Sequence, residues 1–172
     1  MGTEKRMWIS VNLDQRASQT RTNIDNRGEV KLDMTDVFTR SKRSWVMSRI
    51  RGRDTTPEKV IRSMLHSCGF RFRLHVNDLP GRPDVVLPKY RTVIFVNGCF
   101  WHHHAGCKQA VYPKHRSRFW RLKIDRTVER DKRAIRRLRY LGWRVTTVWE
   151  CEIERGDELR RRLTIFIKST AP

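Results

Sequence analysis

Residues 79–101 read LPGRPDVVLPKYRTVIFVNGCFW, and two short apolar runs within them predict the centre of the fold. Asp84–Leu87 and Thr92–Val96 are typical of buried strands. Pro88-Lys89-Tyr90 separates the two runs and predicts a turn, because proline fixes φ and lacks a backbone donor. The segment therefore predicts a hairpin of two buried strands.

Further elements are predicted on both sides of this hairpin. Thr55-Thr56-Pro57-Glu58 is typical of a helix start, with a capping box and a proline in the first turn, and Gly69 ends that helix. Phe70–Leu74 alternates apolar residues with arginine and predicts a strand, as does the β-rich segment Trp143–Trp149. Helices are also predicted over residues 42–52, 117–141 (broken near 125–127) and 157–168. This order of elements predicts an α/β fold with a mixed sheet flanked by helices.

Charge divides the chain into two parts. The 172 residues carry a formal net charge of +20, yet residues 1–40 hold seven basic and six acidic side chains. Because those forty residues also lack a sustained apolar period, we expect residues 1–39 to be a flexible extension, with a short helix near Val30–Phe38. Residues 40–172 are the predicted folded domain.

Composition excludes several classes of protein. The longest apolar run is Val93–Val96, too short to cross a bilayer as a helix, and the first residues lack the apolar core of a secretory signal. The strong positive charge indicates a polyanionic partner, most simply nucleic acid. Four cysteines in a non-secreted chain are more typical of a metal site than of disulfides.

A loop that begins at Cys99 and ends at Cys107 contains three consecutive histidines, His102–His104. Thiolate and imidazole ligands so close together suit tetrahedral zinc, with one further ligand required. Cys151 directly follows a predicted strand and is the better candidate, because Cys68 completes the apolar stripe of its helix. The sequence therefore predicts a structural zinc site and leaves open which histidine binds.

Two carboxylates have both a structural and a catalytic interpretation. Asp84 stands at the mouth of an apolar strand, where it could bind Mg²⁺ or merely cap a turn. Glu58 is fully explained by its capping box, although it could also serve catalysis. A histidine that zinc does not use could act on a phosphate beside such a carboxylate.

Aromatic and basic residues point to a nucleic-acid surface. Phe100, Trp101 and Trp120 lie in or just after loops, where they could wedge between bases or pack around the metal loop. Residues 114–144 hold 13 Lys and Arg residues against three acidic ones, on a helix whose apolar residues mark an inner face. We expect this basic excess to face phosphates. The inner face is predicted from Val128, Ile135, Leu138 and Leu141.

Over residues 40–155 the chain resembles the very short patch repair (Vsr) endonucleases of bacteria. The motifs that carry the resemblance are RDTTPE (53–58), LPGRPD (79–84), VIFVNGCFWH (93–102), VERD (128–131), LGWRV (141–145) and VWEC (148–151). The resemblance implies a restriction-endonuclease-like fold in a nuclease domain over residues 40–172. It also implies nicking of one strand 5′ to the T of a T·G mismatch left by deamination of 5-methylcytosine.

The resemblance also implies roles for individual residues. Asp84 and the backbone carbonyl of Val96 would hold a catalytic Mg²⁺, Glu58 would hold water near it, and His102 would lie at the scissile phosphate. Asn97 stands where some members carry a second histidine; it can form hydrogen bonds but cannot carry a proton at neutral pH. The implied zinc ligands are Cys99, His104, Cys107 and Cys151. The implied DNA-wedging residues are Met47, Phe100, Trp101 and Trp120.

The implied setting is a monomer in the bacterial cytoplasm, associated with the nucleoid, whose partners are mismatched duplex DNA and mismatch-repair proteins. Two alternatives remain: a restriction-type nuclease of the same fold that cuts intact duplex, and a zinc-stapled DNA-binding module without catalysis. The presence of Glu58, Asp84 and His102 together argues against the second.

Overall fold

The computed structural model describes residues 23–24, 30–31, 39–49, 52–114 and 116–169, and it divides the chain into two compact units, Met1–Arg43 and Ser44–Pro172. In the first unit β1 (Asn23–Ile24) pairs antiparallel with β2 (Val30–Lys31). The helix expected near Val30–Phe38 is therefore wrong at its first two residues, and its remainder, like most of the expected flexible extension, lies outside the described residues. The basic helix is confirmed as α1 (Arg40–Arg49).

A three-stranded mixed sheet forms the centre of the second unit. Its order is β3 (Val85–Leu87), β4 (Thr92–Asn97) and β5 (Arg144–Trp149). The first two strands pair antiparallel around a 3₁₀ turn, η2 (Pro88–Tyr90), which confirms the hairpin. β4 and β5 pair in parallel along their whole length, so both strands end at the same edge of the sheet.

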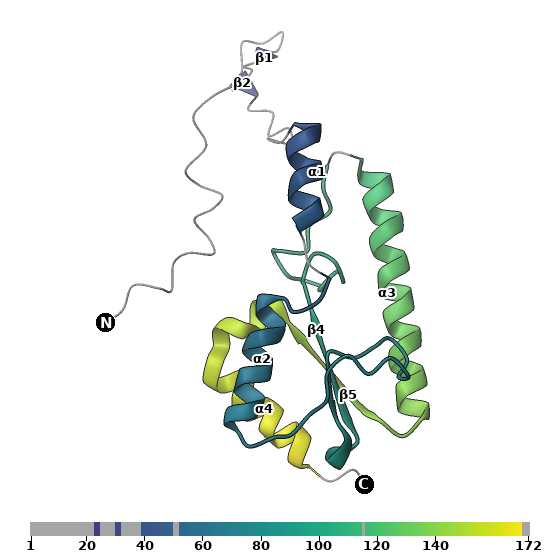
Figure 1. The fold of residues 1–172 in the computed structure, drawn as a ribbon. Helices are drawn as coiled ribbons and strands as arrows, with labels where there is room; N and C mark the ends of the chain where they lie inside the picture. The colour runs from purple at the N-terminus through teal and green to yellow at the C-terminus, as the bar shows by residue number, and fades with distance from the viewer. Residues whose placement is uncertain (1–22, 25–29, 32–38, 50–51, 115, 170–172) are drawn as a thin grey trace, which may run out of the picture. The chain divides into compact units, whose positions relative to one another are not determined.

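Helices cover both faces of this sheet (Figure 1). α2 (Thr56–Ser67) and α4 (Gly156–Lys168) lie on one side, and α3 (Ser117–Tyr140) lies on the other. α2 begins as predicted, because Thr55 and Glu58 form the reciprocal capping box. A short 3₁₀ segment, η3 (Glu150–Arg155), joins β5 to α4. The mixed α/β fold with flanking helices is thus confirmed.

The core divides into two apolar clusters, because alternate strand residues point to opposite faces of the sheet. Between the sheet and the helices α2 and α4 the buried residues are Ile61, Met64, Leu65, Phe70, Val85, Leu87, Ile94, Val148, Leu159, Leu163 and Ile167. Beneath α3 the buried residues are Val86, Val93 and Leu138. The larger cluster fixes the strands, and the smaller one docks the long helix against them.

Three local expectations are wrong. Phe70–Leu74 does not form a strand; only Arg73 makes an isolated bridge, to Val86. α3 runs without interruption through residues 125–127, because the buried Ile124 anchors it. The Thr127 hydroxyl donates to the Lys123 carbonyl at 3.1 Å within the helix. Leu141 is not on the inner face but exposed at the end of the helix.

Among the described helices, none combines the length and the apolar character that crossing a bilayer requires.

Candidate active site and metal centre

A pocket of about 800 Å³ opens where β4 ends, beside the start of α2 and the middle of α3. Its lining includes every residue that the resemblance places at the magnesium site or the scissile phosphate. These residues are Glu58, Asp84, Val96, Asn97 and His102. Residues from four separate segments therefore converge in one cavity.

Asp84 is half-buried, and its position is fixed from two sides. Its Oδ2 accepts a hydrogen bond from the Val96 backbone N–H at 2.7 Å. Just before it, Gly81 has φ +74 and lies so close to α3 that an added Cβ would sit 2.7 Å from the Ala134 Cβ. Burial raises the pKa of Asp84 to about 6; the Val96 hydrogen bond opposes this rise and the charge of Glu58 adds to it. A buried carboxylate is energetically unfavourable in its ionised form unless a positive charge lies beside it. Such an oxygen ligand suits a hard divalent cation.

Glu58 is only 4% exposed, and both carboxylate oxygens have partners. Oε1 accepts from the Thr55 hydroxyl at 2.8 Å, and Oε2 accepts from the Asp54 backbone N–H at 3.0 Å and from the Arg62 guanidinium at 2.7 Å. The capping role is therefore real. Glu58 nevertheless lines the pocket, so the same carboxylate adds its negative charge to that of Asp84.

His102 forms a close pair with Asp131, a residue to which the sequence analysis assigned no role. The His102 Nδ1 and the Asp131 Oδ2 lie 2.5 Å apart, and both side chains line the pocket. A carboxylate at Nδ1 fixes the ring and leaves Nε2 as the nitrogen for other partners. Asp131 shares its helical face with Val128, Ile135 and Leu138, so an acidic residue on an apolar stripe was the signal that could have identified it.

A second cluster lies directly after the ends of β4 and β5. Its four ligand atoms lie within 4.8 Å of one another and can hold a metal ion. The His104 Nδ1 is 3.7 Å from the Cys99 Sγ and 3.4 Å from the Cys151 Sγ, and the His104 ring stacks on Trp149 at 4.2 Å. The members are Cys99, His104, Cys107 and Cys151. Cys68 is not among them: it caps α2 and receives a contact from the Thr164 hydroxyl.

Aromatic rings gather between the metal loop and the start of α3. The Phe100 ring centroid is 5.0 Å from that of Trp101 and 5.4 Å from that of Trp120, and the two indoles are 6.1 Å apart. The Lys123 ammonium lies over both indoles, at 5.4 and 5.3 Å. We call Phe100, Trp101, Trp120 and Lys123 the aromatic cluster. Met47 belongs to α1, and its side chain lies outside the described part of the chain.

A family model for the DNA mismatch endonuclease Vsr matches residues 35–109. The chain is 48% identical over 130 residues to the type II nicking enzyme V.XorIIP of Xanthomonas oryzae pv. oryzae, an alignment that covers 76% of this chain and 95% of that enzyme. The chain belongs to the Vsr family. It is also 48% identical over 126 residues to the DNA mismatch endonuclease Vsr of Escherichia coli K12, which covers 73% of this chain and 80% of that protein.

Among solved structures, the catalytic domain of the homing endonuclease I-Bth0305I aligns with this Vsr family member at a TM-score of 0.48 and 22% identity. The alignment covers 67% of this chain and 100% of that domain.

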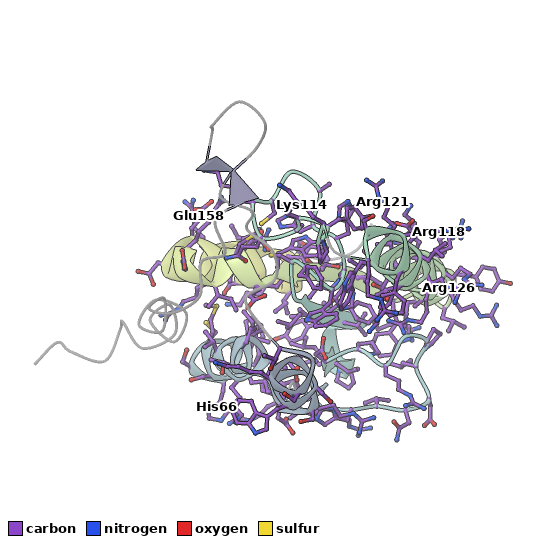
Figure 2. The ribbon with its side chains drawn as sticks, turned by 90° about the horizontal axis from the view of Figure 1, so that it is seen from above. His66, Lys114, Arg118, Arg121, Arg126 and Glu158 are labelled. Carbon is purple, nitrogen blue, oxygen red and sulfur yellow. The ribbon has the colours of Figure 1, made fainter. Side chains whose placement is uncertain are left out.

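The outer face of α3 in this Vsr family member is basic. Arg118, Arg121 and Arg126 are exposed and extend from the helix, and Lys114 precedes it (Figure 2). Phe119 is 46% exposed and therefore also belongs to this surface. The basic residues thus follow the helix that also carries Asp131 into the pocket.

Proposed function

We propose that this protein is a magnesium-dependent mismatch endonuclease that nicks one DNA strand 5′ to the T of a T·G mismatch produced by deamination of 5-methylcytosine. One observation supports this above the others: Trp101 belongs both to the aromatic cluster and to the pocket that contains Asp84 and the His102–Asp131 pair. A surface suited to unstacked bases therefore adjoins a pocket suited to hydrolysis.

Asp84 and the Val96 carbonyl would hold the Mg²⁺, which would polarise the phosphate and stabilise the leaving 3′-oxygen when bound. His102, oriented by Asp131, would place Nε2 against the scissile phosphate as acid or charge partner. Asn97 at the end of β4 would form a hydrogen bond with the phosphate or a water. Glu58 would hold water near the metal while it caps α2. The product would be a nick with a 5′-phosphate.

The second cluster would hold structural zinc, because thiolate and imidazole ligands in a closed set of four suit that ion. Cys99 follows β4 and Cys151 follows β5, so the ion would join the ends of two neighbouring strands. It would also fix the loop that presents Phe100 and Trp101.

The aromatic cluster would enter the DNA from the major groove beside the mismatch, with Met47 inserted from the minor-groove side. A T·G wobble pair stacks less well than a Watson–Crick pair, so its step opens at lower cost, and unstacking a step costs a few kcal/mol. The exposed arginines of α3 would hold the backbone phosphates. We also propose that residues 40–172 form the nuclease domain, that the protein acts as a monomer, and that it works on nucleoid DNA in the cytoplasm alongside mismatch-repair proteins.

The test is a nicking assay on matched duplexes that differ only in carrying T·G or T·A at one position, in several sequence contexts and with or without Mg²⁺. Nicking confined to T·G duplexes in the presence of Mg²⁺ supports the proposal. Equal cutting of intact duplex would indicate a restriction-type nuclease instead. The Asp84→Ala variant should lose nicking while its DNA binding stays equal or becomes tighter, because one negative charge near the phosphates is removed.

A further inference from the structure

The active-site pocket contains a second histidine that the proposed mechanism does not use. His75 lies in the segment between α2 and β3 and lines the same cavity as His102. Its side chain is 33% exposed, so the imidazole is accessible to a ligand in this cavity. No other histidine in the described part of the chain lines this cavity.

His75 also lies beside a carboxylate, although less closely than His102 does. Its Nε2 lies 3.5 Å from the Asp54 Oδ1. Asp54 is itself held by the Arg62 guanidinium, which lowers the pKa of that carboxyl and keeps it ionised. Arg62 also binds Glu58, so one partly buried cation connects the His75 pair to the cap of α2.

The backbone supports a fixed position for this pair. Asp54 has φ +55 and His75 has φ +52, both in the left-handed region that side-chain-bearing residues adopt infrequently. Such conformations persist where the surrounding contacts determine them, and they concentrate at ligand-binding sites. With Nε2 turned toward Asp54, the ring nitrogen left for another partner is Nδ1, which has no hydrogen-bond partner among the described residues.

We propose that His75, oriented by Asp54, is a second phosphate-binding imidazole of the active site. As the imidazolium, the form in which both ring nitrogens donate, it directs Nε2–H at Asp54 and donates a hydrogen bond from Nδ1 to the backbone of the cleaved strand. A DNA backbone seated in a cavity of about 800 Å³ presents more than one phosphate, whereas His102 can contact one of them. Asn97 can form hydrogen bonds in the same cavity but cannot carry a positive charge there. The imidazole of His75 can carry such a charge. This inference rests on the proposed function, because its ligand is a phosphodiester.

The first arm of the test measures single-turnover nicking of a T·G duplex at saturating enzyme. His75→Ala should slow the reaction at least tenfold, and His75→Gln, which keeps a donor of similar reach, should recover part of the loss. His66→Ala is the matched control, because His66 is exposed on the last turn of α2, outside the pocket and well away from α3 (Figure 2). That variant should nick at the parental rate.

The second arm identifies the phosphate. Duplexes with a single neutral methylphosphonate at each position around the nick are bound to the Asp84→Ala variant, with and without His75→Ala. If His75 binds a phosphate, one methylphosphonate position that weakens DNA binding by the Asp84→Ala variant should have no effect on binding by the double variant. Both changes remove the same contact, so their effects do not add. An unchanged pattern of sensitive positions overturns the inference, including the case in which His75→Ala nicks slowly only because it melts early.

The two proposals fail differently. If the parent protein binds T·G duplex but never nicks it, the proposed function is wrong, while the methylphosphonate pattern still decides the role of His75. If the parent nicks and both His75 variants nick within twofold of it, only the inference about His75 is wrong.

Discussion

Replacing Asp84 by Asn should stabilise the protein at neutral pH while it abolishes nicking. The pKa of Asp84 rises from 3.8 to about 6 on folding, mainly because the carboxyl is buried, so the folded state retains a proton that the unfolded chain has released between these values. The free energy of unfolding therefore falls as pH rises through that window and stays low above it. Because a tenfold change in proton affinity corresponds to about 1.4 kcal/mol, this shift lowers the free energy of unfolding at pH 7.5 by about 3 kcal/mol relative to strongly acidic solution. At pH 5, where the folded-state carboxyl is still largely protonated, the reduction is about 1.5 kcal/mol.

Asn removes this cost and keeps the acceptor that the Val96 N–H requires. The measurement is urea unfolding of both proteins without Mg²⁺, at pH 7.5 and pH 5. The gain from Asp84→Asn should be about twice as large at the higher pH. Asp78→Asn is the control, because Asp78 is exposed and outside the pocket, and it should change stability by less than about 0.5 kcal/mol. If the Asp84→Asn protein is no more stable than the parent at either pH, the inference that the buried carboxylate lowers the free energy of unfolding is wrong.

The candidate zinc ligands, the aromatic cluster, the His102–Asp131 pair and the basic face of α3 each yield a further prediction. Cys151→Ser should lose bound zinc and melting temperature together, whereas Cys68→Ser should retain one zinc per chain by elemental analysis; the opposite result would reassign the fourth ligand. Trp101→Ala should lower nicking of T·G duplex far more than binding of ordinary duplex, with zinc content unchanged; loss of zinc instead would assign Trp101 to packing. Asp131→Asn should slow single-turnover nicking by roughly 10²-fold with DNA affinity intact, and an unchanged rate would remove the His102 pair from the mechanism. Log K for duplex should fall by roughly 0.9 per neutralised phosphate with log salt, and a flat dependence would place the basic face of α3 elsewhere.

The fold was predictable where local signals and burial agree. The capping box at Thr55 and Glu58 marks the start of α2, and the apolar runs around Pro88 mark the hairpin, because each signal is local and the sheet requires the same structure. Phe70–Leu74 alternates like a strand, but a strand also needs a partner along its length, and only Arg73 finds one. The continuity of α3 likewise depends on the packing of Ile124. The prediction of a break near residues 125–127 did not take this packing into account.

The candidate site was predictable as a set of motifs but not as a set of pairs. Asp84 and Cys99 stand in short conspicuous segments beside predicted strands, where ligands are expected. His75 and Asp54 belong to different segments, and no spacing in the sequence indicates that they meet. The guanidinium of Arg62, which holds Asp54 in place, reaches Asp54 and Glu58 only once α2 has formed.

The parallel pairing of β4 with β5 has a consequence for how the protein matures. All of the metal loop and α3 lie between these two neighbouring strands in the sequence, so pairing them closes a long loop at a large entropic cost and is expected late in folding. During synthesis Cys99, His104 and Cys107 leave the ribosome well before Cys151 does. A nascent chain therefore carries two of the thiols and the imidazole without the third thiol, so the four candidate ligands cannot come together until Cys151 has been made.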